Sequence, residues 1–90
     1  MRKQKTIENL ATLKLGKQYQ GIFTDLYRDI EIETPIYYCG YENRTHTLAT
    51  NHGLVSVQDQ DHKMINGQWV HHDKHMPMFV VIFAKEGEEK

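Results

Sequence analysis

The sequence has 90 residues, of which 39% are hydrophobic and 26% charged, and its formal net charge is −1 at pH 7. A chain of this length forms one domain with a small core, and its near-neutral charge argues against nucleic acid as the main ligand, because phosphate binding needs a basic surface. The longest apolar run, residues 78–84, is too short for a membrane helix of about 20 residues, and the lone Cys39 fits a reduced, cytoplasmic protein.

The two ends of the chain are expected to lie outside the folded part. Residues 1–5 contain a small basic cluster that we expect to be flexible, as chain termini usually are. Residues 86–90 form an acidic run without apolar side chains, which predicts a disordered tail. We therefore expect a single globular domain over residues 6–85.

Residues 7–15 show the spacing of a short amphipathic helix. Leu10 and Leu13 fall on one helical stripe. Thr6 is a suitable N-cap, and Gly16 can end the helix in a left-handed conformation. A helix of about nine residues is marginal alone, so we expect it to pack on the rest of the domain.

The next segment fits two kinds of secondary structure. β-Branched and aromatic side chains favour a strand near residues 19–24, followed by a turn over residues 25–29 and a second strand from Ile30. The apolar positions within residues 21–30 also recur at helical spacing, so an amphipathic helix is the alternative.

From there on, strand-like runs alternate with turn residues. The runs cover residues 36–41, 45–50, 54–58, 64–65, 68–70 and 78–84. Asn66-Gly67 is the strongest turn signal and predicts a type I′ hairpin. The run 78–84 is apolar on both faces, which is typical of a central strand covered on two sides.

These elements predict an α+β, β-rich fold. We expect a short N-terminal helix on a small antiparallel sheet, or on an SH3-like partly open barrel, of five to seven short strands. The expected core consists of Leu10, Leu13, Ile22, Ile32, Ile36, Tyr38, Leu48, Val55, Val57, Trp69, Val70, Val80 and Ile82.

Histidines gather near the end of the domain. His71, His72 and His75 lie close together in sequence, and His62 precedes them in a polar loop. These four side chains are the candidate zinc ligands, which would have to converge on one point at about 2.0–2.3 Å from the metal. Their spacing matches no strong zinc signature, so the sequence favours a solvated loop and no cofactor.

Tyrosines and an arginine form the candidate partner-binding surface. Tyr37 and Tyr41 are expected on one face of the strand 36–41, because alternate residues of a strand share a face. His46 follows across a short turn, with Arg44 at its tip. Tyrosine and arginine are enriched at the energetic centres of interfaces. The structural alternative is that these tyrosines cover the sheet against the N-terminal helix.

The sequence thus favours a small intracellular binding or regulatory module rather than an enzyme. Its size and its lack of catalytic motifs fit an inhibitor of a host protein encoded by a phage or mobile element, on compositional analogy alone. One alternative is a small His-dependent hydrolase or nuclease, with or without metal. Another is a histidine-driven, pH-sensitive assembly, which includes a homo-oligomer.

Overall fold

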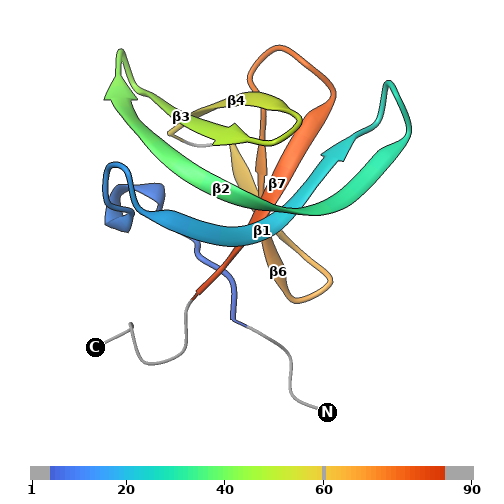
Figure 1. The fold of residues 1–90 in the computed structure, drawn as a ribbon, viewed down its shortest axis with the longest axis horizontal. Coiled ribbons are helices and arrows are strands. Elements are labelled where there is room, and N and C mark those ends of the chain that lie inside the picture. Colours follow the sequence, from blue (N-terminus) through green and yellow to red (C-terminus); the bar gives the residue numbers. More distant parts are fainter. Residues whose placement is uncertain (1–4, 60, 85–90) are drawn as a thin grey trace.

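A computed structural model describes residues 5–59 and 61–84 of the protein (Figure 1). These residues form one seven-stranded antiparallel sheet and a single short 3-10 turn. The strands are β1 (Gln18–Asp25), β2 (Ile30–Glu42), β3 (Thr45–Thr50), β4 (Gly53–Gln58), β5 (His62–Ile65), β6 (Gln68–His72) and β7 (Met78–Phe83). The predicted acidic tail, and the predicted flexible N-terminus apart from Lys5, lie outside the described residues.

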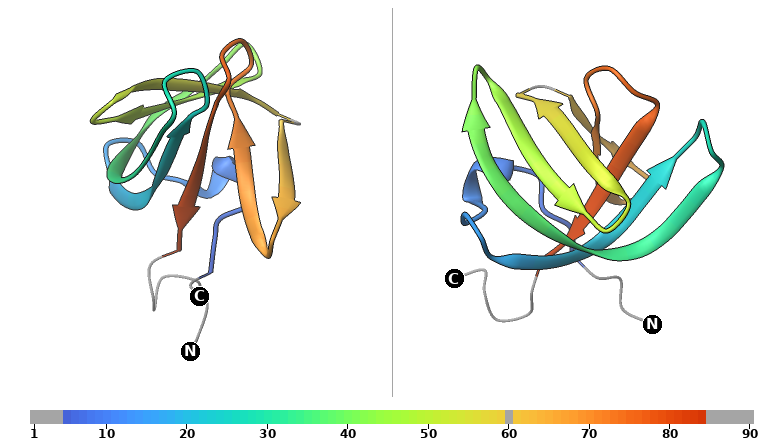
Figure 2. Two further views of the ribbon diagram at one scale, coloured as in Figure 1. Left: turned by 90° about the vertical axis from the view of Figure 1, so that its right-hand side faces the viewer. Right: turned by 45° about the horizontal axis from the view of Figure 1, so that its top comes forward.

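The sheet curls into a half-barrel, which agrees with the expected β-rich, partly open architecture (Figures 1 and 2). Its strand order is β4-β3-β2-β1-β7-β6-β5. The apolar run of β7 therefore lies inside the sheet, between β1 and β6, as its sequence predicts. The loop after β6 reaches the edge strand β4, where the N–H of Lys74 donates to the C=O of Ser56 at 2.8 Å. This contact closes part of the gap between the two sides of the curl.

The short helix predicted from Thr6 through residues 7–15 is wrong. Residues 5–7 instead run beside the end of β7, where the N–H of Ile7 donates to the C=O of Ile82 at 2.8 Å. This pairing satisfies the backbone groups in a different way from a helix. It also removes Thr6 and Ile7 from any helix, and the shorter helix that remains is less stable alone because helix nucleation is costly.

The segment with apolar residues at helical spacing forms only one 3-10 turn, η1 (Leu10–Thr12). The side chain of Asn9 caps it by accepting the N–H of Ala11 at 3.0 Å. Leu10 and Leu13 are both buried, as expected, because a 3-10 helix returns to the same side every three residues. No helix in residues 5–59 or 61–84 is long and apolar enough to cross a membrane.

The strand interpretation of residues 19–24 is confirmed, and the helical alternative for residues 21–30 is wrong. β1 pairs with β2 on one side and β7 on the other, so its backbone groups are used on both edges. Gly21 permits the close approach of β7. A Cβ atom at this position would lie only 2.1 Å from the carbonyl oxygen of Val81.

The core lies inside the curl, and four of its expected members are not part of it; one of them, Val70, is buried but lies outside the core cluster. Ile22 faces the other side of the sheet, because Tyr19 and Phe23 point inward. Ile32 pairs with Phe23, but it lies where β2 extends beyond β3, and it stays 40% exposed. Trp69 is half-buried. The core cluster consists of Leu10, Leu13, Tyr19, Phe23, Ile36, Tyr38, Leu48, Val55, Val57, Val80 and Ile82.

The predicted tight turns are present. Asn66 and Gly67 have φ values of 52° and 82°, as a type I′ hairpin requires. The sequence leaves residues 51–53 between the strand-like runs 45–50 and 54–58. The β3–β4 turn itself is one residue shorter, because Thr50 pairs directly with Gly53.

Candidate functional site

A β-bulge in β2 decides which tyrosines face the inside of the curl. Tyr38 and Gly40 pair with consecutive residues of β3, so Cys39 is an extra residue in the ladder. Gly40 adopts a φ of 121°, which favours glycine. One inserted residue reverses the alternation of faces beyond it. Tyr41 therefore joins Tyr38 on the inner face, and the expectation that Tyr37 and Tyr41 share a face is wrong.

Four side chains form a connected group on this inner face, which we call the Tyr41 cluster: Tyr38, Tyr41, His46 and Asp59. The ring of Tyr41 lies 4.5 Å from that of His46, and its hydroxyl donates to Oδ2 of Asp59 at 2.8 Å. The hydroxyl of Tyr38 lies 2.8 Å from Nδ1 of His46. On the other side of the imidazole, Nε2 lies 3.5 Å from Oδ1 of Asp59.

The protonation of the cluster follows from these contacts. Burial raises the pKa of Tyr38, so its hydroxyl keeps its proton and can donate to Nδ1 of His46. We therefore assign the imidazole proton to Nε2, which faces Asp59. Burial lowers the pKa of His46, although the carboxylate of Asp59 opposes this shift. At neutral pH the imidazole is uncharged, and both of its nitrogens face side-chain partners.

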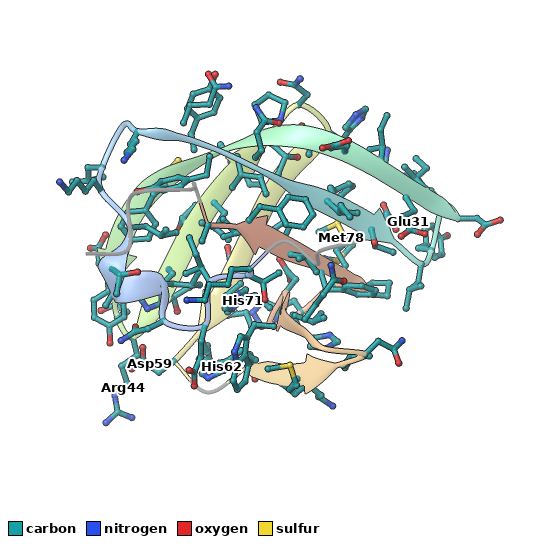
Figure 3. The ribbon with its side chains drawn as sticks, turned by 90° about the horizontal axis from the view of Figure 1, so that it is seen from below. Glu31, Arg44, Asp59, His62, His71 and Met78 are labelled. Atoms are coloured by element: carbon teal, nitrogen blue, oxygen red, sulfur yellow. The ribbon has the colours of Figure 1, made fainter. Side chains whose placement is uncertain are left out.

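The Tyr41 cluster lines an open pocket with a volume of about 690 Å³. The other described residues around this pocket are Glu8, Asn9, Leu10, Ala11, Val57, Gln58 and His62. They come from the N-terminal segment, β4 and the start of β5. A smaller hollow of about 350 Å³ adjoins it at Asp59 and is also lined by Arg44 and Asp61. Figure 3 shows Arg44, Asp59 and His62 at one end of the molecule, with Glu31 at the other.

His71 is buried and contacts the backbone of the N-terminal segment. Its side chain is fully buried, and Nε2 lies 2.7 Å from the C=O of Ile7. Because a carbonyl can only accept, Nε2 carries the proton. Nδ1 has no hydrogen-bond partner among the described residues. Burial lowers the pKa of His71 to about 4, so the side chain is neutral at pH 7 and ties the N-terminal segment to β6.

The four candidate zinc ligands do not meet at one point. The rings of His62 and His71 lie 5.7 Å apart. His72 follows His71 in β6 and points to the opposite face, where its ring lies 5.3 Å from that of Phe79. His75 is exposed in the loop that follows. Within residues 5–59 and 61–84, no three His, Cys, Asp or Glu side chains are grouped closely enough to hold a metal ion.

Two carboxylates of the pocket were not among the site residues predicted from the sequence. Glu8 falls in the segment predicted as a helix, and Asp59 in a polar loop. Nε2 of His62 lies 3.8 Å from Oε2 of Glu8, so these side chains form a second polar pair beside the Tyr41 cluster. The sequence does not show that Glu8 and Asp59 line the same pocket, because the segments that carry them are far apart in the chain.

Apart from the pocket, an exposed apolar surface lies at the tip of the β1–β2 hairpin, which the sequence identifies only as a turn. Leu26 and Tyr27 are 63% and 83% exposed. The carboxylate of Asp25 holds the turn by accepting the N–H of Tyr27 at 2.9 Å and Nε–H of Arg28 at 2.7 Å. An aromatic residue within a predicted turn is the signal that could have singled out this tip.

Comparisons of the chain with protein-family models, with curated proteins and with solved structures find no match.

Proposed function

We propose that this protein is a small binding or regulatory module that acts by protein–protein interaction. Its binding site is the pocket beside the Tyr41 cluster, with Arg44 at the neighbouring rim. The observation that carries the proposal is an exposed aromatic side chain, held by a hydrogen bond, in the lining of a large open pocket. Tyr41 is 52% exposed, and its hydroxyl is bonded to Asp59.

Binding suits this geometry better than proton transfer by His46. A general base needs a ring nitrogen within hydrogen-bond reach of its substrate. Both nitrogens of His46 instead face Tyr38 and Asp59. Such a network holds Tyr41 in place before a partner arrives, which lowers the entropy lost on association. Tyrosine is also one of the residues that most often dominate interface energies.

The contact set differs from the one that the sequence suggests. Tyr41, His46 and Arg44 stay in it, because they lie in or beside the pocket. Tyr37 leaves it, because it lies on the opposite face, where its hydroxyl donates to Oε1 of Gln18. We further propose a cytoplasmic host protein as the partner, with this chain as its phage- or mobile-element-encoded inhibitor, on the grounds of size and composition.

A His-dependent hydrolase is the competing proposal, and His62 is the residue that favours it. Its imidazole faces the pocket and lies 3.8 Å from the carboxylate of Glu8, an arrangement that can orient a general base. Hydrolysis of RNA or of simple esters by the purified protein, lost in His62→Ala but kept in His75→Ala, would replace the binding proposal with this one.

Affinity purification with matched tyrosine variants tests the binding proposal. Wild type, Tyr41→Ala, Tyr37→Ala and Tyr27→Ala serve as baits, and captured proteins are quantified by mass spectrometry. We expect Tyr41→Ala alone to weaken capture, by about 5- to 30-fold for a loss of about 1–2 kcal/mol. Circular dichroism confirms that each bait is folded.

Two outcomes would overturn the proposal. In the first, folded Tyr41→Ala captures the same proteins as wild type and to the same extent. In the second, capture is lost with Tyr27→Ala and kept with Tyr41→Ala, which would transfer the contact to the β1–β2 hairpin tip.

A further inference from the structure

We propose that the pocket beside the Tyr41 cluster receives a positively charged side chain, the guanidinium of arginine or the ammonium of lysine, from the partner polypeptide. This inference rests on the proposed function and names the chemical class of the ligand. It follows from the charge, the aromatic wall and the apolar floor of the pocket.

The pocket is negatively charged although the whole chain is nearly neutral. Its described lining residues include the carboxylates of Glu8 and Asp59 and no lysine or arginine. The adjoining hollow adds the carboxylate of Asp61 and one cation, Arg44. The two hollows together hold three carboxylates and one guanidinium, whereas the chain as a whole has 12 acidic and 11 basic residues. Carboxylates that line one concave surface raise the local concentration of cations.

The aromatic wall of the pocket suits a cation with a planar or compact head. The hydrogen bond from Tyr41 fixes the carboxylate of Asp59 beside the tyrosine ring. The side chain of Asp59 remains 46% exposed, and its oxygens keep lone pairs for further donors. A guanidinium or ammonium group can therefore bond to Asp59 while it lies over the face of Tyr41, within about 6 Å of the ring centre.

The floor of the pocket suits the aliphatic part of a long basic side chain. Leu10 and Val57 line it and belong to the buried core cluster. Lysine and arginine commonly lay their methylene groups along an apolar surface and keep the charged head in a polar environment. The opening, about 690 Å³ in volume, has room for such a chain together with the backbone that carries it.

Other ligand classes fit less well. An anion would face Glu8 and Asp59 without a cation in the lining to balance them. A bare divalent ion needs several oxygen or nitrogen donors around one point. The described residues contain no group of three or more acidic, histidine or cysteine side chains that could supply them.

A titration with small cationic probes tests this inference. Wild-type protein labelled with ¹⁵N is titrated with N-acetyl-arginine amide and with N-acetyl-citrulline amide, which has nearly the same shape without the charge. We expect the arginine probe to shift the signals of Glu8, Tyr41, His46 and Asp59 with millimolar affinity, weakened by salt. We expect the citrulline probe to leave these signals in place.

Charge-neutral variants provide the matched control. The double variant Glu8→Gln/Asp59→Asn keeps the side-chain shapes and an acceptor for Tyr41, and we expect it to bind the arginine probe about tenfold more weakly. Glu31→Gln removes one exposed carboxylate at the opposite end of the molecule (Figure 3) and should bind like wild type. Equal shifts with citrulline, or undiminished binding by the folded double variant, would overturn the inference.

The titration and the bait experiment can fail independently. If the arginine probe does not bind but Tyr41→Ala still loses its captured partner, the pocket is a protein-binding site for a different kind of side chain. If the probe binds and the captured proteins do not depend on Tyr41, the cation site stands and the partner-binding proposal fails.

Discussion

Mild acid should destabilise this protein through His71. The imidazole is fully buried, and it joins β6 to the N-terminal segment through a 2.7 Å hydrogen bond from Nε2 to the C=O of Ile7. A proton on the buried Nδ1 would place a charge where no described group accepts it. Burial therefore lowers the pKa of His71 from 6.5 to about 4, and the hydrogen bond to Ile7 only partly opposes this shift.

The direction of the pH dependence follows from this lowered pKa. The unfolded chain takes up the proton near pH 6.5, whereas the folded protein takes it up only near pH 4. The stability contributed by neutral His71 is thus fully present above pH 6.5 and is lost progressively as the pH falls towards 4. At about 1.4 kcal/mol per pH unit, the loss reaches about 2.5 kcal/mol at pH 4.5. A small domain has only about 5–15 kcal/mol in total.

Urea unfolding at pH 7.5 and 4.5, followed by the fluorescence of Trp69, measures this loss. His71→Gln keeps a donor for Ile7 but does not titrate, so its stability should change by about 2.5 kcal/mol less between the two pH values than that of wild type. His75→Gln alters an exposed histidine and should behave like wild type. Equal losses of stability between pH 7.5 and 4.5 in His71→Gln and wild type would refute this role of His71, as would an NMR titration that places its pKa near 6.5.

Three further substitutions test the fold and the cluster. Gly21→Ala would place a Cβ 2.1 Å from a β7 carbonyl oxygen, so we expect a loss of about 2 kcal/mol or more in urea unfolding; unchanged stability would contradict this close approach. Tyr38→Phe removes the hydroxyl beside Nδ1 of His46 and should cost about 1 kcal/mol, with altered ¹⁵N shifts of the imidazole as the direct readout. Asp73→Ala removes the acceptor for the N–H of Ser56, so amide exchange at Ser56 should accelerate while that of central β1 stays slow.

The strands and tight turns could be predicted from the sequence because their causes are local. Asn66-Gly67 takes the two positive φ angles of a type I′ turn in any context that allows a hairpin. The run 78–84 is apolar on both faces and therefore needs cover on both sides, which an interior strand provides. These signals depend on neighbouring residues alone, so they indicate the β-rich architecture without knowledge of the pairing.

The N-terminal helix was mispredicted because long-range pairing overrides local spacing. Thr6 and Ile7 have side chains that suit a helix start, but their backbone groups pair with the end of β7. The spacing of Leu10 and Leu13 fits an α-helix and a 3-10 turn equally well over one turn. The pairing with β7 keeps Thr6 and Ile7 out of a helix, and local spacing carries no signal of that pairing.

The amino-acid sequence alone determined that this is a small β-rich domain, because side-chain alternation and turn chemistry act between near neighbours. The tertiary structure decided what faces the pocket. The extra residue Cys39 in β2 turns Tyr41 inward, and Glu8 and Asp59 line one pocket only in the folded chain. His71 is neutral for the same reason, since its burial depends on a segment far away in the chain.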